Sequence, residues 1–251
     1  MKLAFSSPTK NENEQELLFT RFQSMGYEGL QLKPPQYAPY VKDTSRFIEL
    51  WREQKGITSA LIAGGSLNEL NQNELRSLFS FSRKVGVERI VYCHGISREK
   101  VTNSDLKTYA RTLSDLAYEA REEHGVSLSL HHHYDQPVMY REDFDVFFDH
   151  VKENTVTLTI DTAHLYKSGI QDIAEVINSF SSYIDNFHLK DFSQGEWKVL
   201  GEGEINFAPV FQAIKKINYQ GWVSADEESG GDLLQAMEDC YNYMSHGLLS
   251  K

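Results

Sequence analysis

The amino-acid sequence predicts one α/β domain, a (β/α)8 TIM barrel over residues 1–251. Eight short runs of β-branched and apolar residues are each followed by a stretch with the spacing of an amphipathic helix. The runs begin near residues 2, 28, 57, 87, 126, 156, 184 and 222, and these intervals of 26 to 39 residues suit βαβ units. An open doubly wound sheet would want a Gly-rich GxGxxG turn after an early strand, but Ser6, Ser7 and Pro8 follow the first one.

The first half of the chain contains four strand-and-helix units. Short apolar runs predict strands over 2–6, 28–32, 57–63 and 87–93, and apolar residues at helical spacing predict helices over 11–25, 44–55, 67–85 and 102–125. Gly26, Gly56, Gly86 and Gly125 stand where these helices should stop. Thr102 and Asp105 have the spacing of a capping box.

The second half repeats the pattern. Strands are predicted over 126–130, 156–161, 184–189 and 222–226, and helices over 140–151, 172–180, 207–217 and 232–244. Pro209 is compatible with the first turn of its helix. Residues 165–169 are expected to form a loop, so Asp161 is not expected to cap a helix.

Composition and charge narrow the class of protein. A net charge of -11 without clusters of Lys and Arg argues against a nucleic-acid partner. No run approaches the roughly 20 apolar residues of a membrane span, and the N-terminus lacks the apolar stretch of a signal peptide, so we expect a cytoplasmic protein without a membrane partner. Cys93 and Cys240 are interpreted as buried free thiols. The oligomeric state stays open, a homo-oligomer included.

Histidines and carboxylates follow the last four predicted strands. Because the carboxyl ends of barrel strands meet at one face, these side chains should converge there. Histidine with carboxylate is a ligand set for one divalent transition metal ion such as Mn²⁺, Co²⁺ or Zn²⁺. The residues concerned are His131, His132, His133, Asp161, His164, His188, Asp226, Glu227 and Glu228.

Candidate site residues at the strand ends also have simpler structural explanations. His94, after the fourth strand, suits a hydrogen-bonded histidine at the barrel mouth as well as a substrate contact. His188 lies between Phe187 and Leu189, where a satisfied core histidine is the alternative. His131 and His133 share one face of their strand, so that at least one of them should face the barrel mouth.

Four motifs occur in order along the chain: IDTAHL at 160–165, FHLKD at 187–191, LGEGEINF at 200–207 and GWVSAD at 221–226. They resemble the motifs of the xylose-isomerase-like TIM-barrel superfamily, the sugar phosphate isomerase/epimerase group. The resemblance covers nearly the whole chain. It implies a single divalent metal ion held at the ends of strands five to eight.

Carried over to this sequence, the resemblance gives Asp161, His188 and Asp226 as metal ligands. His131 stands where the family has a strand-five Glu, and we expect it to be the fourth ligand. Asp226 itself replaces a family Glu, with Glu228 nearby as a substitute. The resemblance makes His164 and Lys190 substrate contacts, as His94 and His133 are also expected to be. Asp226, Glu228, Lys190 and His164 are the candidate catalytic groups.

The activity implied by the resemblance is a metal-dependent isomerase or epimerase that acts on a sugar or polyol through an enediolate. The run His131–His133 also resembles inosose dehydratases of the same superfamily, so a lyase is an alternative, as is a barrel that has lost catalysis. An apurinic-site endonuclease is disfavoured by the net charge. Without an Arg cluster or a Gly-rich phosphate loop, an unphosphorylated carbohydrate or polyol is the expected substrate.

Overall fold

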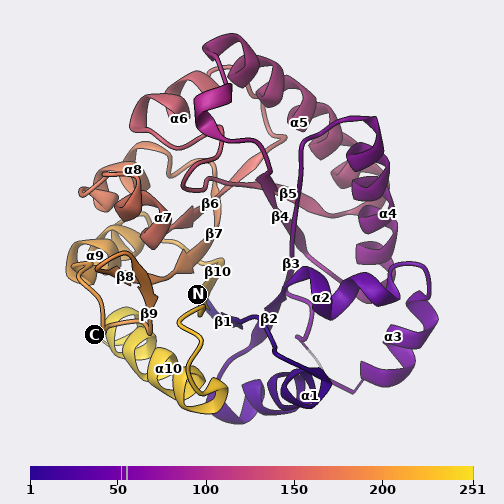
Figure 1. Ribbon diagram of the computed structural model, residues 1–251, viewed down its shortest axis with the longest axis vertical. Coiled ribbons are helices and arrows are strands. Elements are labelled where there is room, and N and C mark those ends of the chain that lie inside the picture. Colours follow the sequence, from indigo (N-terminus) through magenta and orange to yellow (C-terminus); the bar gives the residue numbers. More distant parts are fainter. Residues whose placement is uncertain (52, 55, 251) are drawn as a thin grey trace.

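The computed structural model describes residues 1–51, 53–54 and 56–250, and its centre is a closed barrel of parallel strands (Figure 1). The strands follow one another around the barrel in the order β1-β10-β7-β6-β5-β4-β3-β2. This arrangement confirms the predicted TIM barrel. The strands are β1 (Lys2–Ser6), β2 (Gly29–Leu32), β3 (Ala60–Gly65), β4 (Arg89–His94), β5 (Ser127–His131), β6 (Thr157–Asp161), β7 (Ile184–Leu189) and β10 (Trp222–Asp226).

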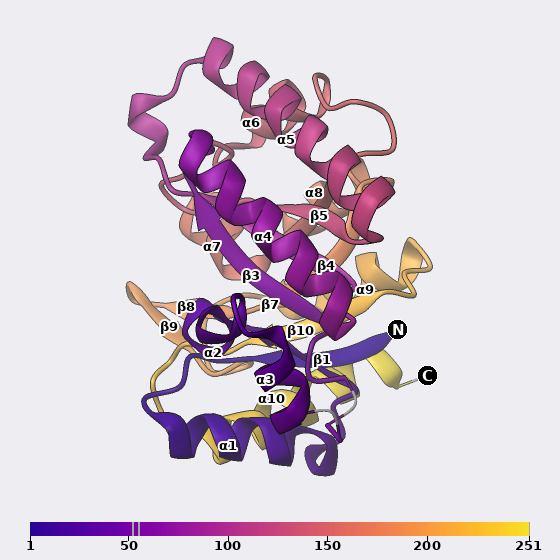
Figure 2. The ribbon, with the colours of Figure 1, turned by 90° about the vertical axis from the view of Figure 1, so that its right-hand side faces the viewer.

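Helices surround the barrel and cover its outer face (Figures 1 and 2). The α-helices are α1 (Glu12–Arg21), α2 (Pro34–Tyr37), α3 (Thr44–Trp51), α4 (Glu69–Val85), α5 (Asn103–His124), α6 (Arg141–Phe148), α7 (Thr162–Lys167), α8 (Ile173–Ser179), α9 (Phe207–Lys216) and α10 (Leu233–Leu249). Among the described residues, the short 3-10 helices are η1 (Phe22–Met25), η2 (Ala38–Tyr40) and η3 (Arg98–Lys100).

The helix ends follow the capping chemistry expected from the sequence. Thr102 and Asp105 form the capping box of α5. Gly26, Gly86 and Gly125 have φ angles of 101°, 79° and 69°, the left-handed conformation that ends a helix. Of the helix expected over 44–55, α3 covers residues 44–51, and residues 52 and 55 lie outside the described residues.

The loop predicted over 165–169 is wrong at its start, because α7 extends to Lys167. The Asp161 carboxylate accepts a hydrogen bond from the His164 backbone N–H at 3.0 Å, so Asp161 is the N-cap of α7. The stretch from Thr162 to Lys167 is too short to carry an apolar period, and therefore the cap alone could have indicated this helix.

A small antiparallel hairpin, β8 (Asp191–Ser193) and β9 (Glu196–Lys198), follows β7 directly and was not predicted. Gln194 and Gly195, at its tip, have φ angles of 52° and 87°, as a tight two-residue turn requires. Figure 2 shows the hairpin on the side of the barrel opposite the N-terminus. It therefore stands beside the carboxyl ends of the strands.

The layer between strands and helices is apolar, but part of the barrel interior is polar. Ser129, Thr159 and Asn186 belong to the adjacent strands β5, β6 and β7, and Gln31 belongs to β2; all four are at most 1% exposed. No helix in the described part of the chain combines the length and apolar character needed to cross a membrane.

Candidate metal centre at the barrel mouth

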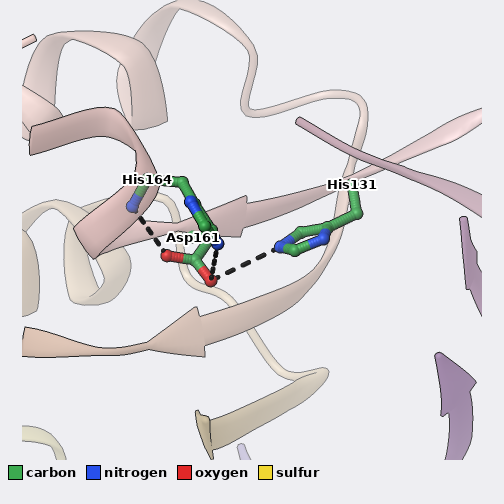
Figure 3. Close-up of side chains that lie close together, drawn as sticks. All are labelled: His131, Asp161 and His164. Atoms are coloured by element: carbon green, nitrogen blue, oxygen red, sulfur yellow. Dashed lines mark hydrogen bonds and ion pairs between the residues drawn. The ribbon is translucent and has the colours of Figure 1, made fainter. Parts of the chain in front are cut away.

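Asp161, the last residue of β6, lies among three imidazole rings at the barrel mouth. Its Oδ2 atom is 3.4 Å from His131 Nε2, 3.9 Å from His188 Nδ1 and 4.0 Å from His164 Nε2. Figure 3 shows the carboxylate between the rings of His131 and His164. All four side chains are buried, with exposed fractions of 5% or less.

The barrel register explains why these residues meet. Asp161 pairs with His188 across β6 and β7, and His131 pairs with Thr159, two residues before Asp161. His164 reaches the same point from the first turn of α7, which the Asp161 cap fixes in place. One potential ligand atom from each of Asp161, His188 and Asp226 lies within 4.8 Å of the other two, and the same holds for His131, Asp161 and His164.

The His188 ring has a defined orientation at this centre. Its Nε2 atom is 2.7 Å from Gln31 Oε1, which can only accept a hydrogen bond, so Nε2 carries the proton. Its Nδ1 atom then presents a lone pair toward Asp161 and has no hydrogen-bond partner among the described residues. Two buried lone-pair atoms that face each other leave a place for a cation. The residues present therefore fit a bound divalent metal ion.

Asp226 has different neighbours. Its Oδ1 is 2.6 Å from Lys33 Nζ, and its Oδ2 is 3.2 Å from Lys190 Nζ. Glu228 also contacts both ammonium groups, Lys33 at 2.7 Å and Lys190 at shorter range. The four side chains form an alternating charge square, with each lysine between two carboxylates. The Lys190 ammonium also lies 4.4 Å from the centre of the Trp197 ring in β9.

The two lysines of the charge square stay protonated. Burial lowers the pKa of Lys190, but Asp226, Asp161 and Glu228 outweigh burial and raise it. Lys33 behaves in the same way beside Asp226 and Glu228. Burial raises the pKa of Asp226, but the two lysines lower it well below its usual value. Lys33, Lys190 and Asp226 are therefore charged at neutral pH.

The histidines around Asp161 divide into two kinds. Burial lowers the pKa of His188 to about 3 and that of His164 well below its usual value, so both are neutral at pH 7. Burial also acts on His131, but Cys93 and Asp161 outweigh it and raise its pKa to about 10. For Asp161, burial raises the pKa, while His164, His131 and Lys190 lower it well below its usual range.

Cys93 is a free thiol, as expected from the sequence, but it is not fully buried. It is half-buried at the end of β4, and its Sγ lies 2.8 Å from His131 Nδ1. The thiol thus holds the ring nitrogen of His131 that faces away from Asp161. The apolar run around Cys93 predicted a core position, but it contained no information about the histidine on the neighbouring strand. Cys240 is buried, as expected.

The other predicted histidines occupy three environments. The His133 ring packs on His164 with 3.6 Å between ring centres, and His164 also packs on Trp197 at 5.0 Å. His132 turns the other way, packs on Phe144 and accepts a hydrogen bond from the Asp161 backbone N–H at 2.9 Å. His131 and His133 thus lie on the same side as His164, and His132 lies on the other, as the strand alternation predicted.

His94 is buried against Tyr109 of α5, with 4.4 Å between ring centres, and burial lowers its pKa to about 4. This contact is with the helix layer. Its expected role as a substrate contact stays a prediction.

Lys33, Gln31, Cys93 and Trp197 are site residues that sequence reasoning missed. Lys33 and Gln31 belong to the second strand and its end, which carries no histidine or carboxylate to draw attention. Trp197 lies on the hairpin that the sequence pattern did not reveal. A general expectation that every strand end contributes to the mouth would have identified Lys33.

Comparison with known proteins shows the family. A family model described as xylose isomerase-like TIM barrel matches residues 19–241. An inosose dehydratase from Clostridium perfringens is 29% identical over 157 residues, 55% of this chain and 52% of that protein. An inosose dehydratase from Geobacillus thermodenitrificans is 32% identical over 135 residues, 46% of this chain and 44% of that protein. The chain thus matches about half the length of these curated relatives.

Solved structures share the whole fold. An L-ribulose 3-epimerase superposes with a TM-score of 0.81 at 18% identity, covering 99% of this chain and 94% of that chain. The IOLI protein, with a zinc atom, superposes with a TM-score of 0.77 at 18% identity, covering 99% and 98%. Taken with the family model, the barrel and its strand-end residues lead to one conclusion: the chain belongs to the xylose isomerase-like TIM barrel family.

Proposed function

We propose that the protein is a divalent-metal-dependent isomerase or epimerase of an unphosphorylated sugar or polyol that carries a carbonyl group. The observation that carries this proposal is the unpartnered Nδ1 lone pair of His188, directed at the Asp161 carboxylate. His131 lies beside Asp161 in one cluster of potential ligands, and Asp226 lies beside Asp161 and His188 in another. Asp161, His188 and His131 would hold the metal ion, with Asp226 as the fourth ligand, shared with the two lysines.

A bound divalent ion would polarise the substrate carbonyl and lower the pKa of the neighbouring C–H bond. His164 is the candidate base, because its lowered pKa leaves a neutral imidazole at pH 7 that can take this proton. Lys190 is the candidate acid, because its raised pKa keeps a proton on Nζ that can be delivered to a substrate oxygen. His133 and Trp197 pack on His164 from the mouth side and would limit access of water.

The pairing of both lysines within the charge square supports a substrate without a phosphate group. Both ammonium groups near the centre already contact Asp226 and Glu228, so neither is left over to neutralise a phosphate. One solved structure with the same fold is named an L-ribulose 3-epimerase, and the sugar in that name carries no phosphate group.

A lyase reaction is the second candidate, and one observation favours it. The Lys190 ammonium, fixed beside the centre, could protonate a departing hydroxyl group and so convert the same enediolate into a dehydrated product. The curated relatives, named inosose dehydratases, support this reading too.

The two reactions separate in one experiment. Metal-loaded protein is incubated in D₂O with a panel of unphosphorylated ketoses and with inosose, and the products are followed by NMR. Isomerase or epimerase chemistry introduces deuterium next to the carbonyl without loss of water, whereas a lyase releases water and forms an unsaturated ketone.

The variant His164→Gln should lose deuterium exchange, and His246→Gln, which changes an exposed histidine, is the matched control. A protein that binds a metal ion but neither exchanges deuterium nor eliminates water with any of these compounds would contradict the proposal.

A further inference from the structure

A continuous chain of polar side chains runs through the barrel interior from His188 to Arg89. His188 Nε2 lies 2.7 Å from Gln31 Oε1, and Gln31 Nε2 donates to Asn186 Oδ1 at 2.7 Å. Asn186 Nδ2 lies 3.4 Å from Thr159 Oγ1, which lies 2.8 Å from Ser129 Oγ. Ser129 donates to Asp185 Oδ1 at 2.8 Å, and Arg89 Nε donates to Asp185 Oδ2 at 3.1 Å.

This interior differs from the layers of branched apolar side chains that usually fill such barrels. Gln31, Asn186, Thr159 and Ser129 are fully buried, so each hydrogen bond in the chain replaces one that water would otherwise make. A register shift makes room for the charged end. Leu158 pairs with Ile184 but Thr159 with Asn186, which leaves Asp185 as an extra residue on β7.

The acceptor-only carboxylate at one end fixes the direction of every hydrogen bond. The Asp185 carboxylate, in an ion pair with Arg89, can only accept, so the Ser129 hydroxyl must donate to it. The Ser129 oxygen then accepts from the Thr159 hydroxyl, and Thr159 in turn must accept from the Asn186 amide nitrogen.

The same logic continues to the metal centre. With its nitrogen turned to Thr159, Asn186 presents Oδ1 to the Gln31 amide nitrogen, which leaves Gln31 Oε1 as the acceptor for His188. His188 must therefore carry its proton on Nε2 and expose the lone pair of Nδ1 to Asp161. If both amides were turned the other way, Thr159 would have to donate to Asn186, and the close Ser129–Thr159 contact would have no proton.

We propose that Asp185, at the opposite end of this chain, selects the metal-binding tautomer of His188. Asp185, Ser129, Thr159, Asn186 and Gln31 are positioning residues that act through His188. In the other tautomer, Nδ1–H would face Asp161 Oδ2 as a donor, and the metal ion would meet a proton in place of a lone pair. The inference rests on the proposed function only in taking a metal ion as the ligand of Nδ1.

The test uses the full-length, metal-free protein labelled with ¹⁵N on histidine. Long-range ¹H–¹⁵N spectra distinguish an Nε2–H ring from an Nδ1–H ring, with His188→Gln used to assign the signal. We expect His188 in the wild type to be the Nε2–H tautomer. Thr159→Val, which keeps the shape but removes the hydroxyl, should populate the Nδ1–H tautomer of His188. Thr159→Ser, which keeps the hydroxyl, should give the same spectrum as the wild type.

Zinc affinity, measured by competition with a chelator, gives a second readout. Changes to groups that orient a metal-binding histidine typically cost ~10–100-fold in affinity, and we expect Thr159→Val and Asp185→Asn to fall in this range. Thr159→Ser should stay within about threefold of the wild type. Glu175→Gln is the control, because it breaks an arginine–carboxylate pair with Arg141 that lies outside the hydrogen-bonded series from His188 to Arg89. It should leave zinc affinity unchanged.

If Thr159→Val fails to fold, Ser129→Ala replaces it in the test, because it removes the hydroxyl that connects Thr159 to Asp185. An Nε2–H ring and unchanged zinc affinity in the folded interruption variants would overturn the inference. A wild type that binds no zinc would contradict the proposed function, while the tautomer of the metal-free protein would still decide whether Asp185 controls His188.

Discussion

The two buried carboxylates at the barrel mouth, Asp161 and Asp226, have opposite surroundings. Asp161 faces imidazole nitrogens, of which those of His188 and His164 are neutral at pH 7. Asp226 is held between two full positive charges, those of Lys33 and Lys190. In the metal-free protein the first carboxylate has one cationic neighbour among these rings, the protonated His131, whereas the second has two ammonium groups.

This difference divides the mouth by chemistry. A buried carboxylate is stable only when its charge is compensated. A metal ion that displaced the His131 proton would supply that compensation at Asp161, whereas the Asp226 side keeps its own two cations. We infer that affinity for metal resides mainly at Asp161, and that Asp226 contributes protons and orientation through its lysines.

The largest effect is expected from Asp161→Asn. Asparagine keeps the N-cap of α7, so the fold should be retained while the negative charge is lost. Zinc affinity should fall by well more than the ~10–100-fold loss that is typical when a group hydrogen-bonded to a metal ligand is changed. Asp226→Asn, the matched variant in the other half, should stay within that range. Equal losses from the two variants, measured by chelator competition, would remove the contrast between the two sides.

Lys33→Met should come next, as a loss of stability. Removing one ammonium group leaves Asp226 and Glu228 incompletely paired in a buried place, which typically costs about 3–5 kcal/mol of unfolding free energy. Lys152→Met removes an exposed partner of Asp115 and should cost at most about 1 kcal/mol. Urea unfolding of the metal-free proteins measures both, and similar values for the two variants would mean that the charge square adds no stability.

Metal binding should strengthen with pH because of His131. Its pKa of about 10 means that it is protonated at pH 7 in the metal-free protein, and a metal ion must displace that proton. Zinc affinity should therefore rise about tenfold per pH unit between about pH 7 and 9. His188, with a pKa of about 3, adds no slope there. His131→Gln should flatten the profile, and a slope that persists in this variant would exclude His131 as its source.

The same raised pKa has the opposite effect on the metal-free fold. A folded pKa above the unfolded value of about 6.5 stabilises the protein fully below pH 6.5, and this contribution disappears as the pH rises through about 10. Urea unfolding of metal-free protein across this window should thus show stability declining with pH, and less so in His131→Gln.

The smallest effect is expected from Cys93→Val. The Sγ contact with His131 Nδ1 is one of the two influences that raise the pKa of His131, so its removal should lower that pKa by about one unit. An NMR titration of the His131 ring measures this change. Cys240→Val, in a thiol remote from the centre, is the control. An unchanged titration would leave Asp161 as the sole source of the shift.

Much of the architecture follows from local pattern. Apolar runs such as 126–130 and 184–189 could be recognised as strands because buried strands need a continuous apolar stretch, and their spacing allowed one closed arrangement. Helix ends at Gly86 and Gly125 followed from the left-handed backbone that glycine allows. Barrel closure also explains why strand-end residues gather around Asp161, where His131 and Asp226 lie in two clusters that share this carboxylate.

Tertiary structure alone decided what each of these residues meets. Lys33 reaches Asp226 across 193 positions of sequence, and Gln31 reaches His188 across 157. Such contacts depend on barrel register, including the one-residue shift that leaves Asp185 as an extra residue on β7. Local sequence carries the type of a side chain and the period of its strand. The neighbours that set its charge, tautomer and pKa come from other strands, and only the closed sheet brings them within hydrogen-bonding distance.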